Sequence, residues 1–247
     1  MGSGHRCSLG IIETTAAHSA LLAAEQIVED PVSLTLLTAA LASAPLLTPT
    51  PLAAGDAVAT FTGTLVPDTL PSICQEGSHR LACNGARIKS TSLDLEQLEG
   101  KLMKFEAVLA GVECDIWNVL SATPASATLV SCGTPIPGCP VRFRVGPTGV
   151  IGQYFLFGAV DSAFVPLGPT LGTQLIELPG FFLGSGPTFG DGSAVDVAIP
   201  NDLGLVGLDL WFQGGRFDIG PVGPIELTNA VCFTIGPPLP PCFNPDC

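Results

Sequence analysis

The sequence predicts a mainly β protein with a short helical segment at its N-terminus and an antiparallel β-sandwich in its C-terminal part. Apolar and polar residues alternate over short runs that end at Gly, as in 205–215 and 226–236, which is typical of half-buried antiparallel strands. Gly (29 residues) and Pro (23 residues) are abundant among the 247 residues, which favours short strands and turns. Hydrophobic residues make up 47% and charged residues 13%, the opposite of the balance in disordered chains.

Residues 1–54 are expected to form a helical and linker segment. Apolar residues over 11–29 have helical spacing, and Pro31 ends the pattern. A second short helix is expected over 33–43, with Ser33 as its N-cap, before a Pro-rich linker. Two short helices cannot bury their apolar side chains alone, so this segment is expected to dock on other parts of the protein or on another copy.

The stretch 31–44 has a second interpretation. The apolar run from Leu34 to Leu41 is followed by Ala42-Ser43-Ala44, which resembles the core and cleavage site of a signal peptide. Its upstream flank is acidic, contrary to a signal peptide, so a signal remnant and a folded element both stay open. No run of about 20 uninterrupted apolar residues is present, and no transmembrane helix is predicted.

Residues 55–122 are expected to form a first β domain. Strands are predicted over 57–66, 87–91, 101–109 and 114–120, with a polar excursion bracketed by cysteines over 67–85. This order resembles OB-like domains of secreted bacterial proteins. The resemblance rests on the strand ending at Ser90, the link Leu93-Asp94-Leu95 to Leu98-Glu99-Gly100-Lys101, and the closing strand near Val119. It covers about 65 residues and implies an OB-like β-barrel.

Residues 123–140 are expected to be a linker with a Cys-clamped loop, 141–236 the β-sandwich, and 237–247 a Pro-rich, Cys-clamped tail. The sandwich is expected to hold six to eight strands, near 141–145, 154–159, 164–167, 174–178, 195–199, 208–212, 217–219 and 227–235. The passages 199–213 and 227–231 resemble small β-sandwich modules at the C-terminal ends of exported bacterial proteins. That resemblance implies no activity.

The nine cysteines predict disulfides and an oxidising, extracellular compartment. No pair has CxxC spacing and there are three histidines, which disfavours a metal site. Short turn-rich loops favour the local pairs Cys74 with Cys83, Cys132 with Cys139, and Cys242 with Cys247. Pairing of Cys114 with Cys232 stays open, and the odd number leaves one thiol over, for which Cys7 is the natural candidate.

The sequence predicts neither an enzyme nor a nucleic-acid-binding protein. The net charge of −13 repels phosphate backbones, and Gly184-Ser185-Gly186 lacks a G-x-S-x-G frame. No catalytic residue, metal or cofactor is predicted. The expected roles of other conspicuous residues are structural: His18 and His79 solvated, Arg87 and Lys89 on one solvated face, Trp117 and Trp211 in cores, and the loop of Asp191 near Asp196 a turn rather than a calcium site.

These observations favour an extracellular structural protein that self-assembles into a homo-oligomer, as a filament or surface-layer subunit. The hydrophobic N-terminal segment would supply the contact. The candidate assembly residues are its apolar side chains: Leu21, Leu22, Ile27, Leu34, Leu37 and Leu41. The alternative is a secreted binding module that uses the OB-like domain for an oligosaccharide or another small ligand.

Overall fold

A computed structural model describes residues 58–69, 77–111, 115–146, 152–188, 193–218, 225–238 and 242. All of them belong to one compact unit, Pro51–Cys247. They form fourteen strands and two short 3-10 turns, η1 (Glu96–Leu98) and η2 (Leu203–Leu205), and no α-helix occurs among them. The prediction of a mainly β protein is confirmed for this part of the chain. The expected helices over 11–29 and 33–43 and all six assembly candidates lie outside the described residues.

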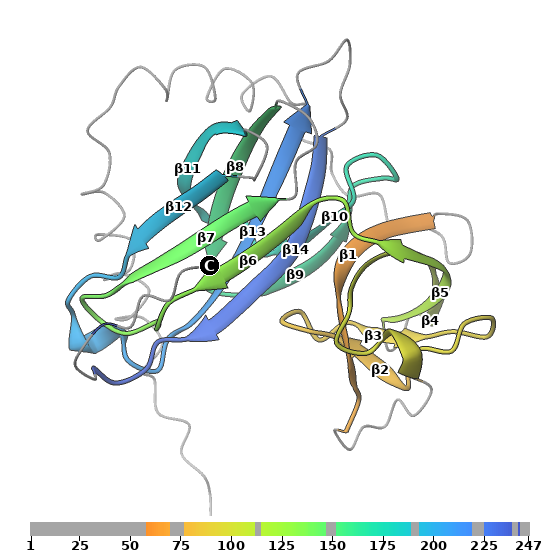
Figure 1. Cartoon of the computed structure of the whole chain (residues 1–247). Coiled ribbons are helices and arrows are strands. Elements are labelled where there is room, and N and C mark those ends of the chain that lie inside the picture. The colour runs from red at the N-terminus through yellow and green to blue at the C-terminus, as the bar shows by residue number, and fades with distance from the viewer. Residues whose placement is uncertain are drawn as a thin grey trace, which may run out of the picture. The chain divides into compact units, whose positions relative to one another are not determined.

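Five strands form a closed barrel (Figure 1). They are β1 (Val58–Pro67), β2 (His79–Leu81), β3 (Arg87–Lys89), β4 (Leu102–Gly111) and β5 (Ile116–Pro124). Their order is β1-β2-β3-β5-β4, and β4 pairs back onto β1. Only β3 and β5 run parallel among these five strands. Four of the strands were predicted. The three-residue β2 was missed because it lies within a polar, Cys-rich stretch.

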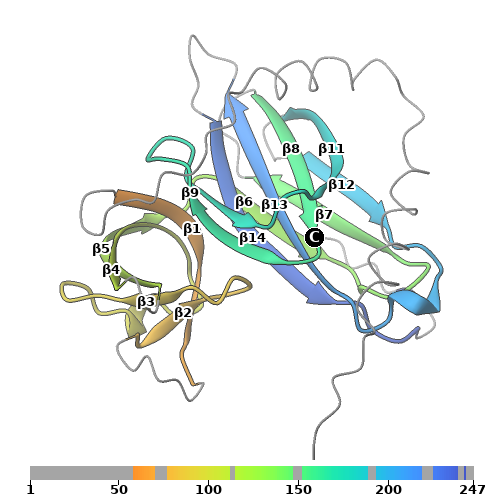
Figure 2. The ribbon, with the colours of Figure 1, turned by 180° about the vertical axis from the view of Figure 1, so that it is seen from behind.

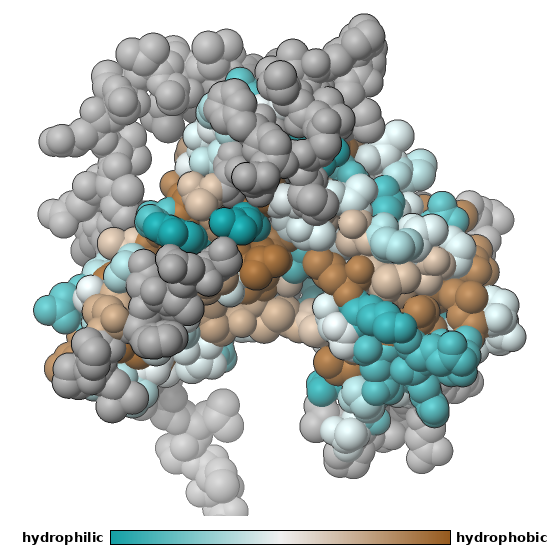
Figure 3. All heavy atoms as spheres, in the orientation of Figure 1, coloured by the Kyte–Doolittle hydropathy of each residue, from teal (hydrophilic) through white to brown (hydrophobic). Residues whose placement is uncertain are grey.

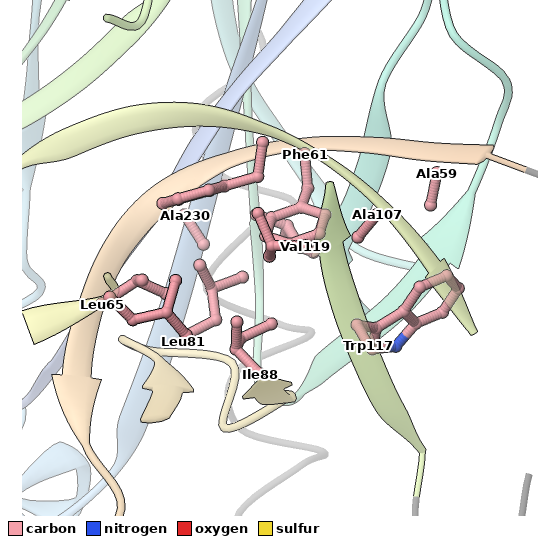
Figure 4. Close-up of a cluster of buried hydrophobic side chains, with 12 residues drawn as sticks. Ala59, Phe61, Leu65, Leu81, Ile88, Ala107, Trp117, Val119 and Ala230 are labelled. Carbon is pink, nitrogen blue, oxygen red and sulfur yellow. The ribbon is translucent and has the colours of Figure 1, made fainter. Parts of the chain in front are cut away.

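The barrel core is built from alternate residues of its strands. Phe61, Phe105 and Val119 are fully buried, and Figure 4 shows Phe61 and Val119 converging from different strands. Trp117 belongs to the same buried cluster, as predicted. The cluster also takes in side chains from beyond the barrel: Phe164, Leu175 and Ala230. The barrel therefore does not complete its core with its own strands.

The remaining strands form two sheets that enclose a second core, here called the two-sheet region. One sheet has the order β11-β8-β13-β14 and the other β12-β7-β6. The strands are β6 (Thr128–Cys132), β7 (Pro140–Gly146), β8 (Gly152–Ala159), β11 (Phe181–Thr188), β12 (Ser193–Ala198), β13 (Asp209–Asp218) and β14 (Ile225–Thr234). Between the sheets the rings of Phe143 and Phe212 lie 4.5 Å apart. The two layers are visible in Figures 1 and 2.

Eight strands begin between residues 140 and 236, at the upper end of the predicted range. The runs predicted at 208–212 and 217–219 join into the single strand β13, because Gly214 and Gly215 continue the pairing with β8. The sequence did not predict β6 or β11. β6 lies inside the stretch 123–140 expected as a linker, and β11 is interrupted by Gly and Pro, which masks its alternation.

A hairpin of β9 (Ser162–Pro166) and β10 (Thr173–Ile176) joins the two regions. On the barrel side, the Thr173 hydroxyl donates a 2.7 Å hydrogen bond to the carbonyl of Thr60 in β1. On the other side, the Leu175 N–H donates a 2.8 Å bond to the side-chain oxygen of Gln213 in β13. The hairpin therefore fastens the barrel to the outer face of the four-stranded sheet (Figure 2).

The two disulfides that join described residues are long-range. Cys83 pairs with Cys232 and Cys139 with Cys242, at sequence separations of 149 and 103 residues, and Cys132 is also disulfide-bonded. The predicted pairs Cys74–Cys83, Cys132–Cys139 and Cys242–Cys247 are therefore wrong. Turn-rich spacing pointed to local loops, whereas folding brings the β2–β3 turn against β14. Cys7, Cys74, Cys114 and Cys247 lie outside the described residues.

Each of two buried amides bonds to at least one strand with which its own strand does not pair through the backbone. Asn229 of β14 accepts a 2.8 Å bond from the Leu129 N–H of β6 and donates a 3.0 Å bond to the Leu129 carbonyl. Gln213 accepts from Leu175 and donates to the carbonyls of Thr173 and Thr228, each at 2.9 Å. Because buried polar groups need partners, these amides fix the strands that each one touches.

Candidate functional site

A cleft of about 410 Å³ opens where the barrel meets β9. Its volume falls in the range of about 300–1,000 Å³ that is usual for small-molecule sites. Its lining comes from the β2–β3 turn, the start of β5 and the hairpin: Asn84, Gly85, Ala86, Arg87, Asp115, Trp117, Ser162, Ala163 and Phe164. Three segments far apart in the sequence thus supply one concave surface.

The first wall is the β2–β3 turn, which is held from several sides. Cys83 has a positive φ of 66°, and its disulfide to Cys232 and a 2.6 Å hydrogen bond from the Trp211 indole N–H to its carbonyl hold it there. The Asn84 amide donates to the Ala163 carbonyl and accepts from the Ala86 N–H at 3.1 Å. Positive φ at non-glycine residues concentrates at functional sites. This wall is therefore preformed.

Asp115 forms the second wall, at the end of the β4–β5 connection. Its φ is +47°, a left-handed conformation that Asp tolerates better than most residues. Its side chain is exposed, and no described residue forms an ion pair with it. The carboxylate is thus an acceptor available at the rim of the cleft.

The floor is aromatic. The rings of Trp117 and Phe164 lie 4.8 Å apart, and Phe164 also packs edge-on against Phe61 at 5.3 Å. Trp117 is 7% exposed, so most of the ring belongs to the barrel core and only part of it is accessible. The floor is consequently rigid and apolar under a polar rim.

Arg87 supplies the cation of the cleft. Its Nε atom lies 3.3 Å from one oxygen of Asp68, and Nε of Arg80, its register partner in β2, lies 3.5 Å from the other oxygen. The Asp68 side chain is only 4% exposed, so it positions both guanidinium groups. The prediction that Arg87 lies on a solvated face is therefore wrong, because Asp68 holds its guanidinium group.

His79 is buried rather than solvated, which corrects the prediction. Its two ring nitrogens lie 2.7 Å from the Ser78 hydroxyl and 2.9 Å from a Glu99 oxygen. These contacts tie β2 to the end of η1, the hydrophilic end of the barrel in Figure 3. None of the three residues lines the cleft. Their arrangement serves the barrel structure.

Asp196, one of the oxygen donors weighed for calcium, is paired with Arg142 instead. Two hydrogen bonds of 2.7 and 2.9 Å join the guanidinium to the carboxylate, and they hold the pKa of Asp196 below its usual value. Asp191 lies outside the described residues. Among the residues that are described, no group of three His, Cys, Asp or Glu side chains could hold a metal ion.

Sequence reasoning did not single out Asn84, Asp115, Ser162 or Phe164. One local signal was available: Asn84-Gly85 is a strong hairpin dipeptide, and it indicates a turn between 79–81 and 87–89. The convergence of that turn with β5 and β9 has no local signal. No helix in the described part of the chain is both long and apolar enough to cross a bilayer. Comparison with protein-family models, curated proteins and solved structures found no match to the chain.

Proposed function

We propose that the protein is a secreted, non-enzymatic binding module that holds an uncharged saccharide in the cleft between the barrel and β9. The observation that carries this proposal is the convergence of a guanidinium, a carboxylate and an aromatic floor from three segments. The long-range disulfides are consistent with the oxidising conditions of an exported protein.

The chemistry of the rim favours hydroxyl groups. Arg87 donates hydrogen bonds, Asp115 accepts them, and the Ser162 hydroxyl can do either. Arg80 and Arg87 share the buried Asp68, and Asp115 supplies a second anion, so the charges around the rim balance and a neutral polyol is preferred over a phosphate or a polyanion. The apolar face of a sugar ring would lie on the accessible part of Phe164 and Trp117, as ligands do in sites with an apolar floor.

The barrel topology supports an OB-like assignment. The strand order β1-β2-β3-β5-β4 with a parallel β3–β5 pair is the arrangement expected of a five-stranded OB-like barrel. Such barrels bind oligosaccharides and oligonucleotides on the face of strands 2 and 3 and at the loop between strands 4 and 5. The cleft lies at these places, with Asn84 and Arg87 from the former and Asp115 from the latter.

A glycan array followed by isothermal titration calorimetry tests the proposal. Asp115→Asn keeps the tolerance for positive φ but removes the charge, and we expect a loss of affinity of about tenfold to hundredfold because a charge-assisted hydrogen bond contributes about 1.5–3 kcal/mol. Asp94→Asn, an exposed position outside the cleft, should bind as the unaltered protein does. Equal binding by both variants, or no glycan bound at all, contradicts the proposal.

A second candidate function is self-assembly as an extracellular structural protein. The observation in its favour is an aromatic stripe, defined here as Phe155, Phe157 and Phe182, on the outer face of the four-stranded sheet. The rings of Phe157 and Phe182 lie 5.4 Å apart, and Phe182 is 40% exposed. Exposed apolar patches of this kind mark interaction surfaces. Analytical ultracentrifugation at several concentrations tests this function, which requires mass growth with concentration.

A further inference from the structure

The cleft has a second apolar feature besides its aromatic floor. It is called here the alanine corner and consists of Gly85, Ala86 and Ala163, which come from the β2–β3 turn and β9. Asn84 joins the two segments, because its side-chain amide donates to the Ala163 carbonyl and accepts a 3.1 Å hydrogen bond from the Ala86 N–H. The alanine corner is therefore a fixed part of the cleft wall, and none of its side chains is larger than a methyl group.

Four backbone groups of the alanine corner are already hydrogen-bonded. The Gly85 N–H donates to the Leu81 carbonyl, and the Ala86 carbonyl accepts from the Leu81 N–H, both at 2.8 Å. The Ala86 N–H and the Ala163 carbonyl are bonded to Asn84. A ligand hydroxyl in the corner would leave water and find these groups occupied, which costs free energy. The corner therefore favours an apolar substituent.

The alanine corner also has room for such a substituent. A Cβ atom built on Gly85 meets no atom of the described residues within 4 Å. The aromatic floor offers little further area, since the rings of Trp117 and Phe164 are tilted by 37° to each other and Trp117 is 7% exposed. A sugar ring can cover Phe164 with its apolar face, but a second apolar group of the ligand is needed to fill the corner.

Polar side chains flank the alanine corner on both of its segments. Arg87 follows Ala86, Ser162 precedes Ala163, and both line the cleft. An arginine donates hydrogen bonds and cannot accept them. The Ser162 hydroxyl forms no hydrogen bond to another described residue, so its oxygen can accept one from a ligand. The corner thus offers an apolar space between a donor and an acceptor.

We infer that the cleft selects an N-acetylhexosamine unit over the unsubstituted hexose. The acetamido methyl group fills the alanine corner, the acetamido oxygen accepts from Arg87, and the acetamido N–H donates to the Ser162 oxygen. A free amino sugar fits less well, because it has no methyl group for the corner. The inference rests on the proposed binding function and narrows it to one class of saccharide.

Isothermal titration calorimetry with matched sugars tests the inference. The first set is chitobiose, cellobiose and the disaccharide of glucosamine, which share their linkage and differ in one substituent of each ring. The second set is the methyl glycosides of N-acetylgalactosamine and galactose. In the set that binds, the acetylated sugar should bind about tenfold more tightly than the others, because one buried methyl group and one hydrogen bond together contribute about that factor.

The outcomes separate the inference from the proposed function. Equal affinity for acetylated and unsubstituted sugars, or tighter binding of the glucosamine disaccharide, overturns the inference and leaves the saccharide site in place. The same conclusion holds if none of these sugars binds while another glycan on the array does. If no glycan binds at all, both the inference and the proposed function fail.

A variant that fills the alanine corner gives an independent measurement. Ala163→Leu should lower the affinity for the acetylated sugar about tenfold, the factor that the acetamido group contributes, and leave that for the unsubstituted hexose unchanged. Ala194→Leu, at an exposed position of β12 outside the cleft, should change neither affinity. Circular dichroism of both variants should show an unchanged β signal. The same preference for the acetylated sugar in both variants counts against the inference.

Ser162→Ala keeps the inference testable if the larger residue at 163 disturbs β9, because it removes a single oxygen atom. The affinity for the acetylated sugar should fall several-fold, and its preference over the unsubstituted hexose should fall with it. An unchanged preference would show that the Ser162 hydroxyl does not bind the acetamido group and would overturn that assignment.

Discussion

The barrel and the two-sheet region close their cores in different ways. In the barrel, backbone pairing runs round a complete ring, and no strand is left as an edge. In the two-sheet region β6 and β14 are edges of separate sheets, and the Asn229 side chain bonds both backbone groups of Leu129 across the gap. Because β6 and β14 do not pair through their main chains, the buried Asn229 amide supplies hydrogen bonds between them. The barrel is therefore closed by backbone pairing, whereas a buried side chain joins β6 and β14 of the two-sheet region.

The largest expected effect comes from breaking the disulfide that joins the barrel to the two-sheet region. Replacing Cys83 and Cys232 with serine should lower the free energy of unfolding by about 4–5 kcal/mol in the chain-entropy model, because the bond closes a long loop. It should also weaken ligand binding, because Cys83 anchors the wall of the cleft. Urea unfolding and calorimetric titration measure the two quantities.

The matched control is the pair Cys139 and Cys242, which closes a loop of similar length away from the cleft. Its removal should cost similar stability and leave binding unchanged. If both pairs affect binding equally, the disulfide at Cys83 has no special role in the cleft.

The next effect compares the two regions directly. Asn229→Leu removes the amide that bonds Leu129 and should cost about 2–5 kcal/mol, since two buried backbone groups lose their partners. Asn118→Leu is the counterpart in the barrel, where the side-chain oxygen is buried and has no hydrogen-bond partner among the described residues. That change should be neutral or stabilising. Chemical denaturation of both variants measures the difference, and equal losses would remove the contrast between the regions.

A smaller effect concerns the ion pair between the regions. Lys104 Nζ of β4 lies 2.7 Å from a Glu226 oxygen of β14, and the Ser126 hydroxyl donates to the same carboxylate at 2.9 Å. Because Glu226 is 14% exposed, Lys104→Ala should cost about 1–2 kcal/mol, more than an open surface pair. Lys101→Ala, at an exposed position, should cost nothing measurable by thermal unfolding. Equal melting temperatures for the two variants would show that the pair does not stabilise the junction.

The smallest effect is a pH dependence within the two-sheet region. The Arg142 hydrogen bonds lower the pKa of Asp196 in the folded state, so their stabilisation is present above the ordinary carboxyl pKa and is lost as pH falls through the lowered value. The pair is exposed, so the contribution should stay below about 1 kcal/mol. Urea unfolding at about pH 6 and pH 3 should show a slightly larger acid loss for the unaltered protein than for Asp196→Asn.

The alternation of apolar and polar residues identified the strands that bury one face. It did not identify strands that are very short or that are interrupted by Gly and Pro. β1 and β14 were predicted nearly to their ends because their apolar residues recur at every second position. β2 has three residues, and β11 holds Gly184, Gly186 and Pro187. The boundary between the domains near 122–140 remains a prediction; Cys83–Cys232 implies that fragments cut there stay joined until reduction.

The cleft could not be predicted, because its parts meet only in three dimensions. Asn84, Asp115 and Ser162 belong to three connections, and nothing in their neighbourhoods indicates that they converge. The disulfides failed for the same reason. Short loops between cysteines suggest local bonds, whereas Cys83 meets Cys232 through the packing of the barrel against β14. The sequence shows which cysteines can form disulfides, but the topology of the fold determines which of them pair.

The shared barrel core sets the order in which the protein matures during synthesis. Phe164, Leu175 and Ala230 complete that core, although they follow the last barrel strand by 40 to 106 residues along the chain. When β5 has left the ribosome, the residues that complete the barrel core have not yet been synthesised. The barrel at that stage therefore still exposes apolar side chains. The cleft is incomplete until β9 has been synthesised, because β9 forms part of its lining. The disulfide that anchors its first wall cannot form until Cys232 has been synthesised. Under the proposed binding function, a chain that ends before Cys232 would therefore lack a complete site.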